Sequence, residues 1–133
     1  PQSVYDEVVL KGLERREPEA ASVNTLIREK KFLVEKPKIK REQRALLSQA
    51  DTDVIFLAKE KNATAIIDEI YARDVAESAG VKRHGTLFII LLLLKEKKII
   101  KREAKQYIDG MISFGFYLSI EMYRKTMKKI EEM

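Results

Sequence analysis

Residues 46–69 read LLSQADTDVIFLAKEKNATAIIDE, and this stretch decides the fold. Its first part has a helical pattern over residues 49–61, with Ser48 in position to cap the helix. Its second part is a continuous apolar run over residues 63–68, which is typical of a strand buried on both faces of a parallel sheet. A helix followed by such a strand predicts an α/β fold.

Three acids mark the ends of these two elements. Asp51 stands in the first turn of the helix, and Asp68 and Glu69 end the strand. In parallel sheets, side chains beyond the carboxyl ends of the strands face a common crevice. Oxygen-rich sites of that kind hold Mg²⁺ or Mn²⁺. The stretch therefore predicts a divalent-metal site at this edge of the sheet.

The rest of the chain alternates helical patterns with short strand patterns. Ser3 can cap the first helix, and Pro18 suits the first turn of the second. We expect short strands over residues 32–35 and 81–84. The expected helices cover residues 3–13, 18–30, 70–79, 86–94, 101–113 and 119–132. Together these elements predict a three-layer α/β/α sandwich around a small parallel sheet, with extra helices at the C-terminal end.

The composition excludes several classes of chemistry. The 133 residues suit one domain with its own core. The lack of cysteine excludes disulfides, zinc–thiolate sites and thiol catalysis, and the single histidine, His84, excludes a histidine pair. The longest apolar run, residues 87–94, is well short of the roughly 20 residues that span a bilayer. The first residues carry no apolar targeting core, so we expect a cytoplasmic protein without a membrane partner.

The net charge of +5 is unevenly placed along the chain. One basic cluster covers residues 28–44, and a second covers residues 95–105. Such clusters can neutralise phosphates and bind RNA in a salt-dependent way. The alternative is an ordinary solvated surface on a lysine-rich protein. Abundant Lys and Glu without Cys is also a common composition in thermophiles, including thermophilic archaea.

Five segments together resemble PIN-domain ribonucleases, a family with many prokaryotic toxin nucleases and archaeal RNA-processing endonucleases. Residues 1–7 resemble the family's P-x-x-V-x-x-E helix, and residues 47–58 resemble its LS-x-x-D-x-x-V-x-x-LA helix. Residues 66–76 are similar to the DD-x-x-AR-x-x-A segment of one branch. Residues 85–87 and 115–123 are similar to its GT-hydrophobic and C-terminal signatures. The likeness covers nearly the whole chain, in order and spacing.

This resemblance implies metal-dependent hydrolysis of phosphodiester bonds in RNA. It carries Glu7, Asp51 and Asp68 over as catalytic residues and as ligands of Mg²⁺ or Mn²⁺. Glu69 is a fourth candidate ligand, although the family branch usually has Asp there and the extra methylene moves the carboxylate. Asp53 and Asp74 are outer candidates. The resemblance also implies RNA as a partner and an antitoxin-like protein as a second one.

The family also implies a first strand that precedes the segment matching Pro1 and carries a further Asp. We therefore expect residues 1–133 to form a single, truncated PIN-like domain that lacks this N-terminal strand. A missing central strand leaves apolar surface and unpaired backbone groups exposed. This predicts self-association into a dimer or higher oligomer, through strand pairing, an exchanged segment or the helix over residues 86–94.

The candidate acids also suit purely structural roles. The helix dipole favours Asp51 at the start of a helix, and Asp68 and Glu69 fit a turn that begins a helix. Three functions are therefore compatible with the sequence. They are a metal-dependent endoribonuclease, a catalytically inactive PIN remnant that binds RNA, and an oligomeric interaction module.

Overall fold

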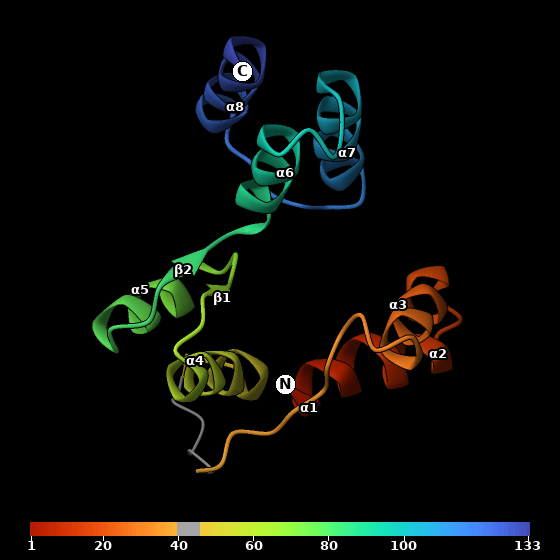
Figure 1. Cartoon of the computed structure of the whole chain (residues 1–133), viewed down its shortest axis with the longest axis vertical. Helices are drawn as coiled ribbons and strands as arrows, with labels where there is room; N and C mark the ends of the chain where they lie inside the picture. Colours follow the sequence, from red (N-terminus) through yellow and green to blue (C-terminus); the bar gives the residue numbers. More distant parts are fainter. Residues whose placement is uncertain (40–45) are drawn as a thin grey trace. The chain divides into compact units, whose positions relative to one another are not determined.

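The computed structural model describes residues 1–39 and 46–133. They form two compact units, Pro1–His84 and Gly85–Met133 (Figure 1). The first unit holds four helical segments and a two-stranded parallel sheet, and the second unit holds three helices. The described chain is thus mostly helical with a small parallel sheet, as an α/β fold predicts. The single domain expected over residues 1–133 stays a prediction.

The first unit opens with one continuous helix made of three stretches. These are α1 (Gln2–Tyr5), the π-helical η1 (Asp6–Leu10) and α2 (Lys11–Glu14). The helix confirms the one predicted over residues 3–13, and it packs against α3 (Pro18–Arg28). Gly12 is buried where the two helices meet. A Cβ atom on Gly12 would lie 2.7 Å from the Cβ of Ala20, so the glycine allows the close approach.

The segment after α3 is extended but is not a strand. The strand predicted over residues 32–35 is wrong, because no described residue forms a ladder with it. Individual hydrogen bonds hold this segment and the residues after it in place instead. The Gln2 N–H donates to the Glu35 carbonyl at 2.9 Å, and the Lys38 N–H donates to both carboxylate oxygens of Glu60 at 2.9 Å. An apolar pattern does not make a strand without a partner edge.

The stretch that decided the fold forms its helix and strand in the predicted order. α4 (Gln49–Lys61) starts at the predicted cap, Ser48, whose Oγ accepts a backbone N–H of the first turn. It ends at Asn62, which takes the left-handed conformation with φ 51° and so turns the chain toward the sheet. β1 (Ala65–Ile66) is shorter than the apolar run predicted over residues 63–68.

A helix connects the two parallel strands of the first unit. α5 (Ile70–Ser78) follows β1 and leads into β2 (Arg83–His84), so that the three elements form a crossover unit. In the register, Ala65 lies opposite Arg83 and Ile66 lies opposite His84. The side chains that form the core come from α4, α5, β1 and the residues that flank these elements. They are Leu47, Ile55, Ala58, Ala65, Ile67, Ala72, Ala76 and Val81.

The second unit is built of three helices around a separate core. They are α6 (Thr86–Lys95), α7 (Lys101–Ser113) and α8 (Ile120–Glu132), close to the predicted bounds. The Oγ of Ser119 accepts the Met122 N–H at 3.2 Å and caps α8. The buried side chains are Ile90, Leu94, Ala104, Ile108 and Ile130. Across the described ranges, every helix is too short or too polar to cross a membrane.

Candidate active site

Glu7 lies in η1, the π-helical stretch of the first helix, and its side chain is exposed. π-Helical turns are rare and occur frequently at functional sites, because the extra residue per turn redirects side chains. Two residues further along the same stretch, Val9 is fully buried and holds this stretch against the unit. The structure therefore places Glu7 at the surface, on an unusual backbone that is anchored from its apolar side.

Asp51 is half-buried in the first turn of α4, where it is engaged with the helix cap. The Ser48 hydroxyl donates to Asp51 Oδ2 at 2.9 Å, and the Asp51 N–H donates back to Ser48 Oγ at 3.0 Å. The positive end of the helix dipole also favours a carboxylate here. Asp51 thus has the structural role at the helix start that the sequence left open, and its Oδ2 is bonded to the cap residue.

Asp68 and Glu69 stand in the loop between β1 and α5, and both side chains are exposed. Glu69 is the cap of α5. Its Oε1 accepts the Tyr71 N–H at 3.0 Å, and its Oε2 accepts the Ala72 N–H at 2.6 Å. Glu69 therefore uses both carboxylate oxygens to cap the helix. Asp68 is one residue beyond Ile67, whose N–H donates to the His84 carbonyl at 2.8 Å.

The candidate site residues carry the type of ligand atom that a divalent cation prefers, but they are not arranged to share one ion. Carboxylate oxygens are the ligands that Mg²⁺ and Mn²⁺ prefer. In residues 1–39 and 46–133, however, no three His, Asp or Glu side chains lie close enough together to hold an ion. Glu7, Asp51, Asp68 and Glu69 therefore do not form a ligand group in this structure. Their role as catalytic residues and metal ligands stays a prediction.

A different polar cluster joins α1 to α4. The Ser3 hydroxyl donates to Asp53 Oδ2 at 2.6 Å, and the Gln49 amide donates to Asp53 Oδ1 at 2.9 Å. On α1, the Gln2 amide donates to Asp6 Oδ1 at 2.9 Å. These side chains line a cavity of about 450 Å³ together with Lys36 and Pro37. The sequence ranked Asp53 as an outer candidate and gave no role to Asp6, although the i,i+4 spacing of both Gln–Asp pairs is visible in it.

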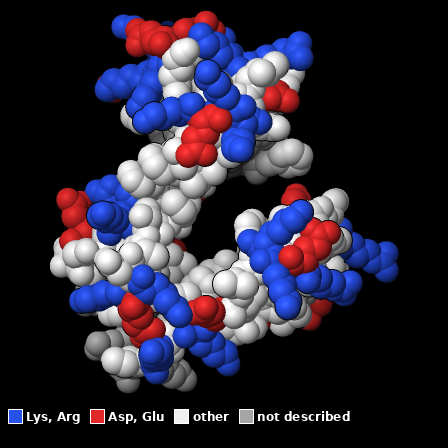
Figure 2. Space-filling model, viewed as in Figure 1, with Lys and Arg blue, Asp and Glu red and all other residues white. Residues whose placement is uncertain are grey.

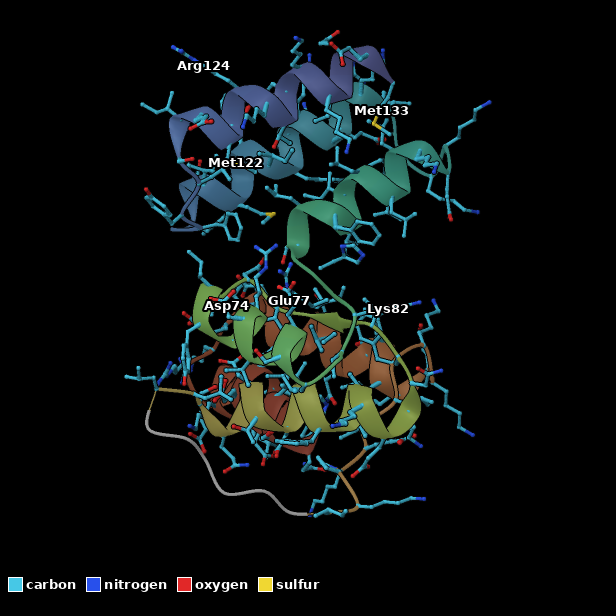
Figure 3. All side chains as sticks on the ribbon, turned by 90° about the vertical axis from the view of Figure 1, so that its left-hand side faces the viewer. Asp74, Glu77, Lys82, Met122, Arg124 and Met133 are labelled. Atoms are coloured by element: carbon cyan, nitrogen blue, oxygen red, sulfur yellow. The ribbon has the colours of Figure 1, made fainter. Side chains whose placement is uncertain are left out.

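Asp74, the other outer candidate, lies in the middle of α5 and is exposed (Figure 3). On the same helix, Glu77 forms an ion pair with Arg83 of β2 at 2.7 Å. This pair ties the end of α5 to the strand that follows it. Glu77 thus has a structural role in the crossover unit.

The basic clusters lie partly on described surface. Figure 2 shows Lys and Arg spread over the visible surface with Asp and Glu between them. Some lysines of residues 95–105 are engaged with α8. Lys105 pairs with Glu131 and holds the pKa of that carboxyl below its usual value, and Lys101 Nζ donates to the Glu131 carbonyl at 2.8 Å. Lys95 and Lys97 line a cavity of about 700 Å³ with an apolar floor. Part of the first cluster, residues 40–44, lies outside the described residues.

A family model described as PIN domain matches residues 1–132. The chain belongs to the PIN-domain family. The match covers both compact units and all five segments that resembled the family in sequence. No curated protein and no solved structure matches the chain.

Membership of the PIN-domain family confirms the predicted fold class, with a small parallel sheet between helices. It also identifies the chain as a member of a nuclease family, and PIN domains generally use divalent metals.

Proposed function

We propose that this PIN-domain protein is a metal-dependent endoribonuclease that hydrolyses phosphodiester bonds in RNA. The observation that carries the proposal is the family match over residues 1–132, because it spans every acid that the sequence singled out. Glu7, Asp51 and Asp68 are the residues on which we expect activity to depend, with Glu69 as a fourth. The cation is Mg²⁺ or Mn²⁺, as the oxygen donors favour.

The arrangement of these acids sets a condition on the proposal. Bonds at the two helix starts occupy Oδ2 of Asp51 and both carboxylate oxygens of Glu69. Among the described residues, no three acids lie close enough together to hold an ion. Cation binding therefore requires the carboxylates to move closer together than they lie here. Clustered carboxylates repel one another, so an added cation favours the state in which they converge.

The test is cleavage of a labelled single-stranded RNA with Mn²⁺, combined with calorimetric titration of Mn²⁺ into the protein. We expect Asp68→Asn to abolish the calorimetric signal and to lower cleavage by about 100-fold, the loss typical of misplaced reacting groups. Glu121→Gln, an equal change of charge on α8, should leave both unchanged. Equal cleavage by wild type and Asp68→Asn would show that the acids do not carry the activity.

A second function is favoured by one specific observation. Because Asp51 is already bonded to the cap residue Ser48, Glu69 caps α5 and the described residues show no ligand group, the chain is also suited to bind RNA without cutting it. In that case the basic clusters carry the interaction. Binding that weakens with salt but ignores Mn²⁺, without cleavage, distinguishes this function from the nuclease.

A further inference from the structure

The polar cavity between the first helix and α4 has the size of a ligand site and a lining that suits a hydroxyl-rich ligand. Its volume of about 450 Å³ lies in the range of small-molecule sites, roughly 300–1,000 Å³. Apart from Pro37, all of its lining residues have polar or charged side chains. They are Gln2, Ser3, Asp6, Lys36, Gln49 and Asp53.

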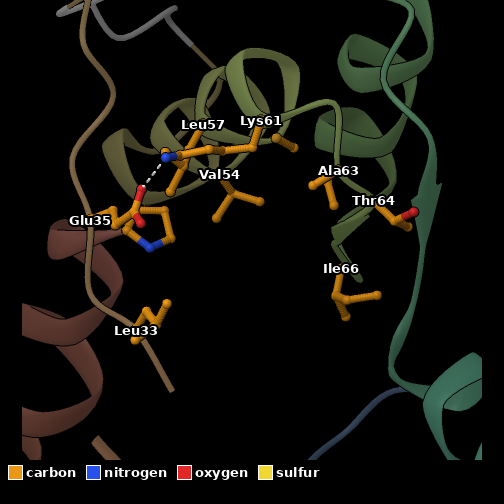
Figure 4. Close-up of a pocket in the computed structure, with 11 residues that line it drawn as sticks. Leu33, Glu35, Val54, Leu57, Lys61, Ala63, Thr64 and Ile66 are labelled. Atoms are coloured by element: carbon orange, nitrogen blue, oxygen red, sulfur yellow. Dashed lines mark ion pairs between the residues drawn. The ribbon is translucent and has the colours of Figure 1, made fainter. Parts of the chain in front are cut away.

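This polar cavity is separate from the space beside the sheet. Pro1 and Ile66 of β1 line a second cavity, in which Glu35 forms an ion pair with Lys61 at 2.8 Å (Figure 4). A chain segment that enters the sheet ahead of Pro1 would lie beside β1, in that second cavity. The two cavities share no lining residue, so such a segment would leave the walls of the polar cavity in place.

Two donors on opposite walls hold the Asp53 carboxylate in one orientation. The Ser3 hydroxyl of α1 donates to Oδ2 at 2.6 Å, and the Gln49 amide of α4 donates to Oδ1 at 2.9 Å. Each oxygen of a carboxylate can accept two hydrogen bonds, so each oxygen of Asp53 keeps one acceptor position. The half-buried Asp53 thus presents an oriented acceptor at the cavity.

A second acid and a cation complete the lining. The Gln2 amide donates to Asp6 Oδ1 at 2.9 Å, which orients another carboxylate, and Lys36 supplies a positive charge. The hydrogen-bond donors of Gln2, Ser3 and Gln49 already point at these carboxylates, whereas a metal ion requires the oxygens of its ligands to face the ion itself. A ligand that offers hydroxyl donors to the acids and a negative charge to Lys36 matches this lining better than a metal ion.

A ribose linked to a phosphate has both features. Its 2′-hydroxyl can donate a hydrogen bond, and the phosphate on the neighbouring carbon is an anion. Acceptance of a ribose hydroxyl by an acidic side chain is an established mode of nucleotide recognition. Deoxyribose lacks this donor, so DNA would leave the half-buried acceptor of Asp53 without its hydrogen bond. The cavity therefore favours RNA over DNA.

We propose that this cavity binds one ribose of single-stranded RNA, with the 2′-hydroxyl donating to Asp53 and Lys36 neutralising the adjacent phosphate. This inference rests on the proposed function for its ligand and adds the group that distinguishes RNA from DNA. Ser3 and Gln49 are positioning residues, because they act through Asp53. Asp53 lies two residues after Asp51 on α4, so the ribose is bound beside an acid on which we expect cleavage to depend.

The test is fluorescence anisotropy with three labelled oligonucleotides of one base sequence, which are RNA, DNA and 2′-fluoro RNA. The 2′-fluoro sugar keeps the pucker of ribose but lacks the hydroxyl donor, so it separates the hydrogen bond from the shape of the strand. EDTA in the buffer prevents metal-dependent cleavage. We expect wild type to bind RNA about tenfold tighter than either analogue, the order of magnitude of one hydrogen bond to a charged group.

A matched pair of variants assigns this preference to Asp53. Asp53→Asn replaces the anionic acceptor by a neutral amide, and we expect it to bind RNA and 2′-fluoro RNA with nearly equal affinity. Glu121→Gln removes the same charge from α8 and should keep the wild-type ratio of the two affinities. Circular dichroism checks that both variants are folded. The comparison of the three oligonucleotides on wild type remains decisive if Asp53→Asn does not fold.

The ribose site and the nuclease function fail in different ways. Equal binding of RNA and 2′-fluoro RNA by wild type overturns the ribose site, as does an unchanged preference in folded Asp53→Asn. A wild type that binds none of the three oligonucleotides overturns it as well. A wild type that prefers RNA in EDTA but does not cut it with Mn²⁺ retains the ribose site and contradicts the nuclease function alone.

Discussion

Gly12 sets the distance between α2 and α3, because a Cβ on it would lie 2.7 Å from the Cβ of Ala20. That Cβ is fixed to its backbone, so relief requires the helices to move apart. Overpacking of this kind costs about 1–3 kcal/mol, which exceeds the gain of about 1 kcal/mol in helix propensity from Gly to Ala. We expect Gly12→Ala to lower the free energy of unfolding, measured by urea titration.

Gly110 provides the matched control for this substitution. It lies within α7, and a Cβ there would meet no described atom within 4 Å apart from its chain neighbours and the backbone of its own helix. Gly110→Ala should therefore stabilise the protein by up to about 1 kcal/mol through propensity alone. Equal stabilisation by both substitutions would mean that α2 and α3 are not held at this distance.

Single residues also show what the sequence could and could not predict of the site. It placed Asp51 at the start of α4 and Glu69 at the start of α5, where the structure has them. A carboxylate at the start of a helix interacts favourably with the free N–H groups there, and a carboxylate can equally bind a metal ion. The position alone therefore does not distinguish a structural role from a metal ligand. Spacing along the chain does not fix distances between elements, so the bonds from Ser3 and Gln49 to Asp53 were not predicted.

At the scale of elements, helices were predicted closely and strands were not. α4 and α7 have the predicted bounds, because capping residues and apolar periodicity lie within the helix itself. Strands depend on partners that are remote in sequence. The apolar run over residues 63–68 is a strand only at Ala65–Ile66, where β2 pairs with it, and residues 32–35 have no such partner among the described residues.

Glu60 connects the extended segment to α4 and makes that connection sensitive to pH. The hydrogen bond from the Lys38 N–H is the main cause that lowers the pKa of Glu60, and the Ile39 N–H adds to it at 3.3 Å. A lowered pKa in the folded state stabilises the protein above the unfolded value, about 4.3, and this stabilisation is lost as pH falls through the folded value.

We therefore expect Glu60→Gln to lower the melting temperature at neutral pH, and this deficit to disappear as the pH falls through the lowered pKa of the folded state. Thermal unfolding followed by circular dichroism from neutral pH downward measures the difference. Glu96→Gln, at an exposed acid after α6, controls for the change in net charge. A deficit that stays constant down to the acid end would exclude the ionised carboxylate as its cause.

At the scale of the whole molecule, the net charge of +5 attracts RNA in general, whereas a binding face requires cations at particular places. Lys95, Lys97 and Lys98 are exposed at the end of α6. Each lysine that neutralises a phosphate contributes about 0.7 to the slope of log K against log salt for single strands. Replacing all three by Gln should therefore reduce the slope by roughly 2, measured by fluorescence anisotropy with labelled RNA.

Replacing three lysines of α8 by Gln removes the same charge from a different place. This control separates the effect of total charge from the effect of a binding face at the end of α6. Lys125 and Lys128 lie near Glu121 and Glu132 of their own helix, at 3.0 Å and 3.9 Å, and Lys129 is the third cation of that control. A cation already paired within its helix releases fewer counterions when RNA binds, and two of these three are paired, so this triple Gln variant should reduce the slope by less than the variant at the end of α6. Equal reductions in both variants would show that total charge, and not a face at the end of α6, determines the affinity for RNA.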